Sequence, residues 1–306
     1  MSEFDALLVA GCSNSYGSEA LKDEDDTYVD CINNSYGKFI QESLNIPNYY
    51  NVAKSGYSNF SISFSCITAL KKLILKYPKN KILVIVGWSD PQRFSVKIRE
   101  NSINISAFSI HQLFKERNKN KFTNNQNKAI NYIKSIPNLA EFLKNLFIFY
   151  LNTDLALKQD MLNKISLESM LKNMGVRYFT FPTLDELIFD EYFFLRTFLD
   201  KKNSIFTFRE NSELALNNKK TLNNNYFNQF ASFMKNTFKN NAGILDGVIK
   251  DYSFFKDHYS YRCFNMMNSF SKYGSSSSGG HLRRSAHIKL AEFLIDTMRS
   301  RDIISK

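Results

Sequence analysis

The sequence predicts an α/β protein with a central parallel β-sheet and helices on both of its faces. Short, uninterrupted apolar runs recur along the chain, and such runs are typical of strands buried on both faces. Segments with helical periodicity alternate with these runs, which is the pattern of βαβ units. The chain of 306 residues is long enough to bury a sizeable core around one such sheet.

Four apolar runs are expected to form the strands, at residues 6–11, 49–53, 82–87 and 176–181. The third run, Ile-Leu-Val-Ile-Val-Gly, has the strongest strand character. Residues 204–208 are a candidate fifth strand. Because helical segments connect these runs, we expect the strands to lie parallel to one another.

Three segments are expected to form helices that cover the sheet. Residues 59–76 place four apolar side chains on one helical face, namely Ile62, Cys66, Leu70 and Leu73. Residues 155–173 form the second helix, which should end at Gly175 because glycine favours the left-handed conformation after a helix. The last helix covers residues 285–299 and directs four apolar side chains toward the core: Ile288, Ala291, Leu294 and Ile295.

The connection between the third and fourth strands is far longer than a crossover requires. We interpret residues 101–169 as a mostly helical insertion, and residues 1–100 and 170–306 as the α/β domain. The insertion contains a very apolar segment at residues 136–151. It also contains a basic, Asn-rich stretch with Lys115, Arg117, Lys119, Lys121, Lys128 and Lys134.

The chain is basic, with 40 Lys and Arg against 29 Asp and Glu and a net charge of +11. Lys and Arg supply phosphate contacts, so the charge alone would allow nucleic-acid binding. The basic stretch, however, is interrupted by Asn and has no zinc-finger, RRM or KH pattern, so we interpret it as a solvated loop. Nucleic acid is therefore not an expected partner, and a weak attraction of this stretch to polyanions is the alternative. The insertion could also contact a protein partner or a second copy of the chain.

Composition also bears on cofactors and location. The four cysteines are far apart and the chain has four histidines, so the sequence predicts free thiols, no metal site and no cofactor. The N-terminus is acidic where a signal peptide is basic, and the longest apolar stretch, residues 146–151, is far shorter than a membrane span. We expect a soluble protein made in the cytoplasm, without an export signal or a membrane partner.

Polar and small residues follow the first two predicted strands, where parallel sheets bind ligands. Ser13 lies in Gly-Cys-Ser-Asn-Ser-Tyr-Gly, at a tight turn into a helix, where backbone N–H groups favour a developing anion. The alternative is that Ser13 or Asn14 only caps this helix. Gly56 follows the second strand and would let a backbone N–H approach a ligand closely, although glycine is also common in simple turns.

Two further segments carry candidate functional residues. Trp-Ser-Asp-Pro-Gln-Arg at 88–93 follows the third strand, and a turn with Pro91 at the start of a helix would not account for its Trp and Arg. His281 follows a Ser- and Gly-rich run and is well placed to act as a base. His287 has helical spacing from apolar residues and is expected to pack.

Together these four blocks resemble the SGNH (GDSL-type) hydrolase family. Gly-Cys-Ser at 11–13 stands where the family has Gly-Asp-Ser, and Gly56 matches the glycine of its second block. Gly-Trp-Ser-Asp at 87–90 matches Gly-x-Asn-Asp. Residues 281–294 match the closing block, in which a His is followed six residues later by another His and then by Leu-Ala-x-x-Leu. The insertion is left unmatched.

The resemblance implies a three-layer α/β/α flavodoxin-like fold and a serine esterase that removes small acyl groups, with O-acetylated carbohydrate as the expected substrate. Ser13 would be the nucleophile and His281 the general base. Its oxyanion hole would use three residues: Ser13, Gly56 and Ser89. Trp88 would stack on a sugar, and Arg93 would meet an acidic sugar or hold its loop in place.

Three departures from the family pattern leave alternatives open. Cys12 replaces Asp, Ser89 replaces Asn, and the position of the triad Asp is occupied by Ser278. A backbone carbonyl could orient His281, as could Asp90 or an acid from another loop. The alternative function is a catalytically weak or inactive SGNH-like structural or carbohydrate-binding protein. The Gly-Cys-Ser opening and the Trp-x-x-Pro-x-Arg block of this chain resemble those of SGNH-like proteins of tailed bacteriophages. With this alternative function the protein would be a component of a virion.

Overall fold

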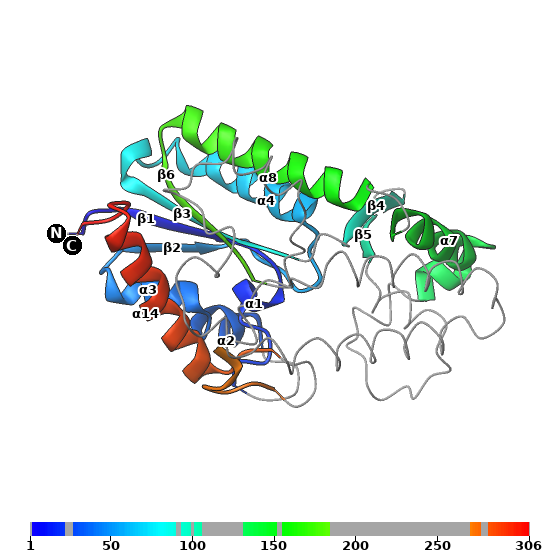
Figure 1. The fold of residues 1–306 in the computed structure, drawn as a ribbon, viewed down its shortest axis with the longest axis horizontal. Coiled ribbons are helices and arrows are strands. Elements are labelled where there is room, and N and C mark those ends of the chain that lie inside the picture. Colours follow the sequence, from blue (N-terminus) through cyan, green and yellow to red (C-terminus); the bar gives the residue numbers. More distant parts are fainter. Residues whose placement is uncertain are drawn as a thin grey trace, which may run out of the picture.

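A central parallel sheet flanked by helices forms the core of the protein (Figure 1). The structure is a computed structural model, and the residues that it describes are 2–21, 27–89, 93–98, 101–105, 131–151, 155–183, 270–276 and 281–305. Within them the sheet has four strands, and every neighbouring pair is parallel. The predicted α/β class with a central parallel sheet is therefore confirmed.

All four strands lie on the predicted apolar runs, with ends shifted by one or two residues. They are β1 (Ala6–Ala10), β2 (Asn48–Asn51), β3 (Ile82–Trp88) and β6 (Arg177–Pro182). Their order in the sheet is β2-β1-β3-β6, and the register sets Ala10 opposite Val86. Every residue of β1 and β3 is buried, as expected for central strands. The candidate strand at 204–208 lies outside the described residues.

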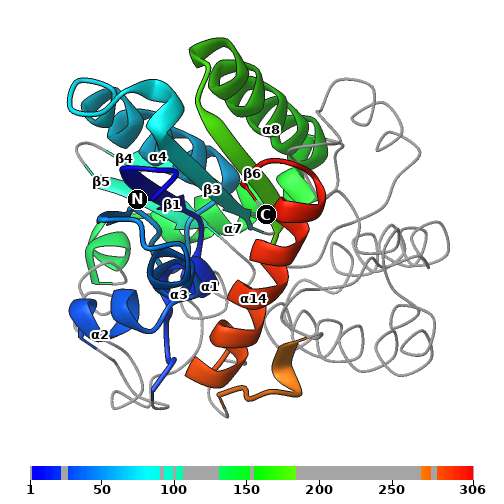
Figure 2. The ribbon, with the colours of Figure 1, turned by 90° about the vertical axis from the view of Figure 1, so that its left-hand side faces the viewer.

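Helices cover both faces of the sheet, because alternate strand residues point to opposite sides. On one face Leu7, Val9 and Ile85 pack with α3 (Tyr36–Ser43) and α14 (Arg284–Ser300). On the other face Leu8, Val84 and Val86 pack with α4 (Asn59–Leu73) and α8 (Leu155–Met174). Figure 2 looks along the strands and shows α4 and α8 above the sheet, with α3 and α14 below it.

The predicted helices form for the expected reasons. All four apolar residues predicted on one face of α4 are buried in the α4–α8 core, and the Ser58 hydroxyl caps its N-terminus by accepting from the Ser61 N–H. Gly175 follows α8 with a φ of +70°, as its predicted role at the helix end requires. In α14 three of the four predicted residues are buried, whereas Ile288 is partly exposed. In the described part of the chain, no helix combines the length and the apolar character needed to cross a membrane.

The segment between β3 and α8 begins with a feature that the sequence analysis missed. β4 (Phe94–Ile98) and β5 (Asn101–Ile105) form an antiparallel hairpin, so residues 101–105 are strand where we expected the start of a mostly helical insertion. Ser95 of this hairpin contacts the Ser58 hydroxyl at 2.6 Å, which ties β4 to the start of α4. Within the apolar segment, α7 (Leu139–Leu151) forms and contacts α8. Most of the basic stretch lies outside the described residues.

Candidate functional site

Ser13 is the first residue of the short helix α1 (Ser13–Tyr16) and lies directly beyond β1. The N-cap of α1 is Cys12, whose side chain makes no capping hydrogen bond. The alternative that Ser13 or Asn14 caps this helix is therefore wrong. The Ser13 side chain lies in a buried position, and its N–H belongs to the first turn, where backbone donors have no intrahelical acceptor.

In the turn between β1 and α1, the Ser15 side chain packs against the backbone of Gly11 after β1 and of Gly87 in β3. A Cβ on Gly11 would lie 2.0 Å from Ser15 Oγ, and a Cβ on Gly87 would lie 2.5 Å from the same atom. Tyr36 donates a hydrogen bond of 2.8 Å to Ser15 Oγ, and Asn51 Nδ2 donates one of 2.9 Å to the Ser15 carbonyl. Burial raises the pKa of the Tyr36 phenol, so it stays a neutral donor. Packing against Ser15 thus requires glycine at positions 11 and 87. Ser15 itself was not among the predicted site residues.

Gly56 follows β2 in a left-handed conformation, with a φ of +81°. No atom lies within 4 Å of the position that its Cβ would take, so the space beside this glycine is open. The turn is closed by a 3.3 Å hydrogen bond from the Tyr57 N–H to the Lys54 carbonyl. Among the described residues, the Gly56 N–H has no hydrogen-bond acceptor. This donor is therefore available to a ligand.

Ser89 follows β3 and is held by the side chain of Asn59 on α4. Its N–H donates to Asn59 Oδ1 at 2.7 Å, and its carbonyl accepts from Asn59 Nδ2 at 2.9 Å. The Ser89 hydroxyl is buried and has no hydrogen-bond partner among the described residues. The same is true of both amide atoms of Asn14, next to Ser13. Unpaired polar atoms of this kind are costly, so they suit a site that a polar ligand completes.

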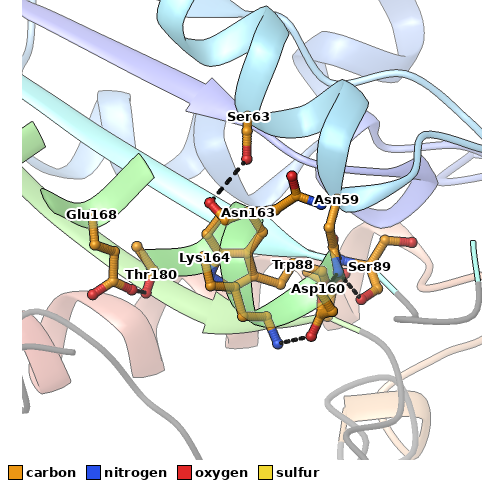
Figure 3. A network of polar contacts seen from close by, with 10 residues as sticks. Asn59, Ser63, Trp88, Ser89, Asp160, Asn163, Lys164, Glu168 and Thr180 are labelled. Atoms are coloured by element: carbon orange, nitrogen blue, oxygen red, sulfur yellow. Dashed lines mark hydrogen bonds and ion pairs between the residues drawn. The ribbon is translucent and has the colours of Figure 1, made fainter. Parts of the chain in front are cut away.

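A buried polar network supports this segment from the α8 side (Figure 3). Asn59 also donates to Asp160, which forms an ion pair of 2.9 Å with Lys164, and both charged side chains are about 95% buried (side-chain exposures of 6% and 5%). Nearby, Thr180 of β6 donates to Glu168 of α8 at 2.6 Å. The sequence holds no local motif for this network, because Asn59 and Asp160 are 101 residues apart.

Trp88 lies in the core that the sheet forms with α4 and α8, and only 3% of it is exposed. Figure 3 shows its indole beside Lys164 and Asn163 and close to Asn59. The expectation that Trp88 stacks on a sugar is therefore corrected, because a buried indole presents no face to a ligand and acts here in packing. Arg93 is partly buried, and its Nε and Nη1 atoms have no hydrogen-bond partner among the described residues. Asp90 lies outside the described residues.

Cys12, which stands where the family has Asp, contacts Thr183 after β6. Its sulfur lies 3.2 Å from Thr183 Oγ1, which in turn donates a 2.6 Å hydrogen bond to the Trp88 carbonyl. Cys12, Cys31 and Cys66 are free thiols, as predicted for the cysteines that the structure describes. The Cys12 side chain therefore links the ends of three neighbouring strands.

His281 lies beside a carboxylate that comes from another loop. Its Nδ1 is 3.1 Å from Oε2 of Glu19, in ion-pair range but without the alignment of a hydrogen bond. Ser278, at the position of the family's Asp, lies outside the described residues. Glu19 is not part of any of the four blocks, although it is the only acidic residue between Asp5 and Asp23. Among the described contacts, no hydrogen bond joins His281 to the Ser13 hydroxyl.

His287 is fully buried and packs as predicted, with its ring 6.2 Å from that of Tyr36. Neither of its nitrogens has a hydrogen-bond partner among the described residues. Burial, and secondarily the charge of His281, lowers the pKa of His287 to about 3. It is therefore a neutral core residue.

Comparison with known proteins adds no family assignment. No protein-family model matches the chain, and no curated protein matches it either.

In the described part of the chain, no group of three or more His, Cys, Asp or Glu side chains is arranged to hold a metal ion.

Proposed function

We propose that the protein is a serine esterase of the SGNH type, which removes O-acetyl or similarly small acyl groups from a carbohydrate. The observation that carries the proposal is the strand order. Ser13 follows β1, which lies between β2 and β3, so Gly56 and Ser89 follow the strands on either side of it. The order β2-β1-β3-β6 also agrees with a flavodoxin-like sheet, in which ligands bind at the carboxyl ends of the first and third strands.

In the proposed reaction, Ser13 Oγ attacks the acyl carbon while His281 takes the hydroxyl proton. The N–H groups of Ser13 and Gly56 and the hydroxyl of Ser89 stabilise the negative charge on the acyl oxygen. The bond to the sugar oxygen then breaks, and His281 returns the proton to that oxygen. Water attacks the acyl-enzyme in the same way, which releases the acid and restores Ser13.

The unpartnered polar groups near this edge support a polar ligand. The Ser89 hydroxyl and the Asn14 amide are buried donors without acceptors among the described residues, and an acyl oxygen would supply one. Arg93 has guanidinium nitrogens without described partners, which favours a substrate that carries a carboxylate.

A second candidate is a carbohydrate-binding or structural protein without catalysis, such as a virion component. The observation that favours it is the lack of a hydrogen bond between Ser13 and His281 among the described contacts. Burial of the Ser13 side chain points in the same direction. In this function the unpartnered polar groups would bind a glycan that is not turned over.

The test compares wild type, Ser13→Ala and Ser18→Ala on p-nitrophenyl acetate and on an acetylated oligosaccharide. Ser18 lies in the same turn and bonds to Ser13 only through its backbone, so it is the matched control. We expect Ser13→Ala to lower kcat/KM by about 10³-fold or more and to abolish labelling by a fluorophosphonate probe. Equal rates for Ser13→Ala and wild type would overturn the esterase. Glycan binding without turnover by any variant would support the second candidate.

A further inference from the structure

Glu19 is bound to the loop of His281 at several points. Its Oε2 lies 3.1 Å from His281 Nδ1 and also accepts a hydrogen bond from the Ser276 hydroxyl. Ser276 Oγ in turn accepts from the His281 N–H at 3.0 Å, and the Ser276 N–H donates to the His281 carbonyl at 2.7 Å. The carboxylate, the serine and the imidazole therefore form one connected unit.

The backbone around Glu19 is fixed by the segment that leads into α14. Arg283 donates to the Glu19 carbonyl at 2.9 Å, and the Arg284 N–H donates to the Ala20 carbonyl at 2.9 Å. Glu19 itself has a φ of +58°, the left-handed conformation that a residue with a side chain rarely adopts. Such conformations persist where the surrounding contacts impose them, and they gather at functional sites.

We propose that Glu19 orients His281 and fixes its tautomer, and so takes the place of the acid that the closing block lacks. A carboxylate 3.1 Å from Nδ1 favours the tautomer that carries its proton on this nitrogen, because the N–H dipole then points at the negative charge, and this leaves the lone pair on Nε2. That nitrogen is then the basic one, and the carboxylate stabilises the imidazolium that forms when it takes a proton. The catalytic consequence rests on the proposed function, whereas the effect on the tautomer does not. Glu19 is a positioning residue, since it acts through His281.

Glu19 corresponds to the alternative of an acid from another loop, and not to Asp90 or to the position of Ser278. It follows the helix of Ser13 along the chain, so one continuous segment, residues 13–19, supplies both the proposed nucleophile and the acid. Both side chains of the Glu19–His281 pair are only about one-fifth exposed, which weakens the screening of their interaction by water. The pair is thus sheltered yet still reachable from solvent.

The first test measures the tautomer directly, through the ¹⁵N chemical shifts of the ring nitrogens at pH 8.5, where an ordinary imidazole is neutral. The His281 signals are assigned by their loss in His281→Gln. We expect the proton on Nδ1 in wild type, and a shift toward the Nε2–H tautomer in both Glu19→Ala and Glu19→Gly. Glycine adopts a positive φ without strain, so Glu19→Gly guards against a variant that fails to fold. The matched control is Glu292→Ala, which removes an exposed carboxylate of α14.

The second test measures hydrolysis by the same variants. We expect kcat to fall about 10²- to 10⁴-fold in Glu19→Ala and by a similar factor in Glu19→Gln, because an amide carries no charge and its NH2 group can donate to Nδ1, which favours the wrong tautomer. An unchanged tautomer in folded Glu19→Ala and Glu19→Gly would overturn the proposal. A tautomer that changes in the Glu19 variants, together with a wild type that hydrolyses no ester, would support the positioning role and reject the esterase. The two failures are therefore distinguishable.

Discussion

The side-chain amide of Asn59 binds both backbone polar groups of Ser89, with distances of 2.7 Å to the N–H and 2.9 Å to the carbonyl. In this way a residue of α4 continues the hydrogen bonding of the sheet beyond the end of β3. Because Asn59 also donates to the buried Asp160, the position of Ser89 depends on α8 as well. The position of Ser89, whose hydroxyl is a proposed oxyanion-hole donor, is thus fixed by contacts with both α4 and α8.

We expect Asn59→Ala to lower the free energy of unfolding by about 3 kcal/mol, because it leaves the Ser89 backbone groups and Asp160 buried without this partner. Urea denaturation measures the loss. The matched control is Ser63→Ala on the same helix, whose hydroxyl makes one 3.5 Å hydrogen bond and should contribute less than about 1 kcal/mol. Equal losses in the two variants would show that the Asn59 contacts do not support the Ser89 backbone.

Because Ser15 packs against Gly87, a side chain at position 87 should destabilise the protein. A Cβ on Gly87 would lie 2.5 Å from Ser15 Oγ and 2.5 Å from Thr183 Cγ2, so Gly87→Ala should destabilise the protein by about 3 kcal/mol through overpacking. Gly175→Ala is the control, since its Cβ meets no atom within 4 Å and only its φ of +70° is unfavourable. We expect that control to lose about 1 kcal/mol.

Thermal denaturation of both alanine variants measures the difference. Adding Ser15→Ala to Gly87→Ala removes the nearest oxygen and should recover part of the loss, although the clash with Thr183 remains. Indistinguishable stabilities for Gly87→Ala and Gly175→Ala would contradict the packing account of this block glycine.

The parts of the fold that the sequence predicts are those with a local signal. The strand at 82–88 is an unbroken apolar run because both of its faces are buried, and α8 ends at a glycine because the left-handed conformation favours one. The hairpin also had a signal, since Phe94–Ile98 alternates apolar and polar residues, but its position inside a long insertion concealed it. The Glu19–His281 contact had no local signal, because 262 positions separate its partners and only the fold brings them together.

Arg93 provides a prediction about specificity within the proposed function. Because its Nε and Nη1 atoms lack described partners, a carboxylate on the substrate would satisfy them with charge-assisted hydrogen bonds. We expect Arg93→Gln to raise the KM for an acetylated acidic oligosaccharide about ten-fold or more relative to the KM for its neutral counterpart.

The comparison uses steady-state kinetics on both substrates, with Arg284→Gln as the control for a change of charge elsewhere. The Arg284 guanidinium lies over the Phe39 ring at 5.2 Å, on the opposite face of the sheet from α4. An equal rise in KM for the acidic and the neutral substrate, together with lower stability, would assign Arg93 to holding its loop.

The lowered pKa of the buried His287 leads to a prediction for the pH dependence of the free energy of unfolding. Its pKa is lowered from 6.5 to about 3 in the folded protein, by burial first and by the charge of His281 second. The unfolded chain therefore binds a proton on this imidazole at higher pH than the folded protein does. The stabilisation from neutral His287 is fully present above pH 6.5, and it is lost progressively as the pH falls from 6.5 toward 3.

The sharpest test is His287→Leu, which keeps an apolar side chain against Tyr36 and removes two unpartnered nitrogens. We expect the variant to be at least as stable as wild type at pH 7.5. Between pH 7.5 and 4.5 it should lose about 2–3 kcal/mol less, since two pH units below 6.5 correspond to about 2.7 kcal/mol for one proton.

The control is Leu290→Ala, a buried apolar residue one turn further along α14, which should lower stability by a similar amount at every pH. Urea denaturation at several pH values separates the two cases. If wild type and His287→Leu lost stability in parallel between pH 7.5 and 4.5, the acid sensitivity of the protein would have to come from groups other than His287.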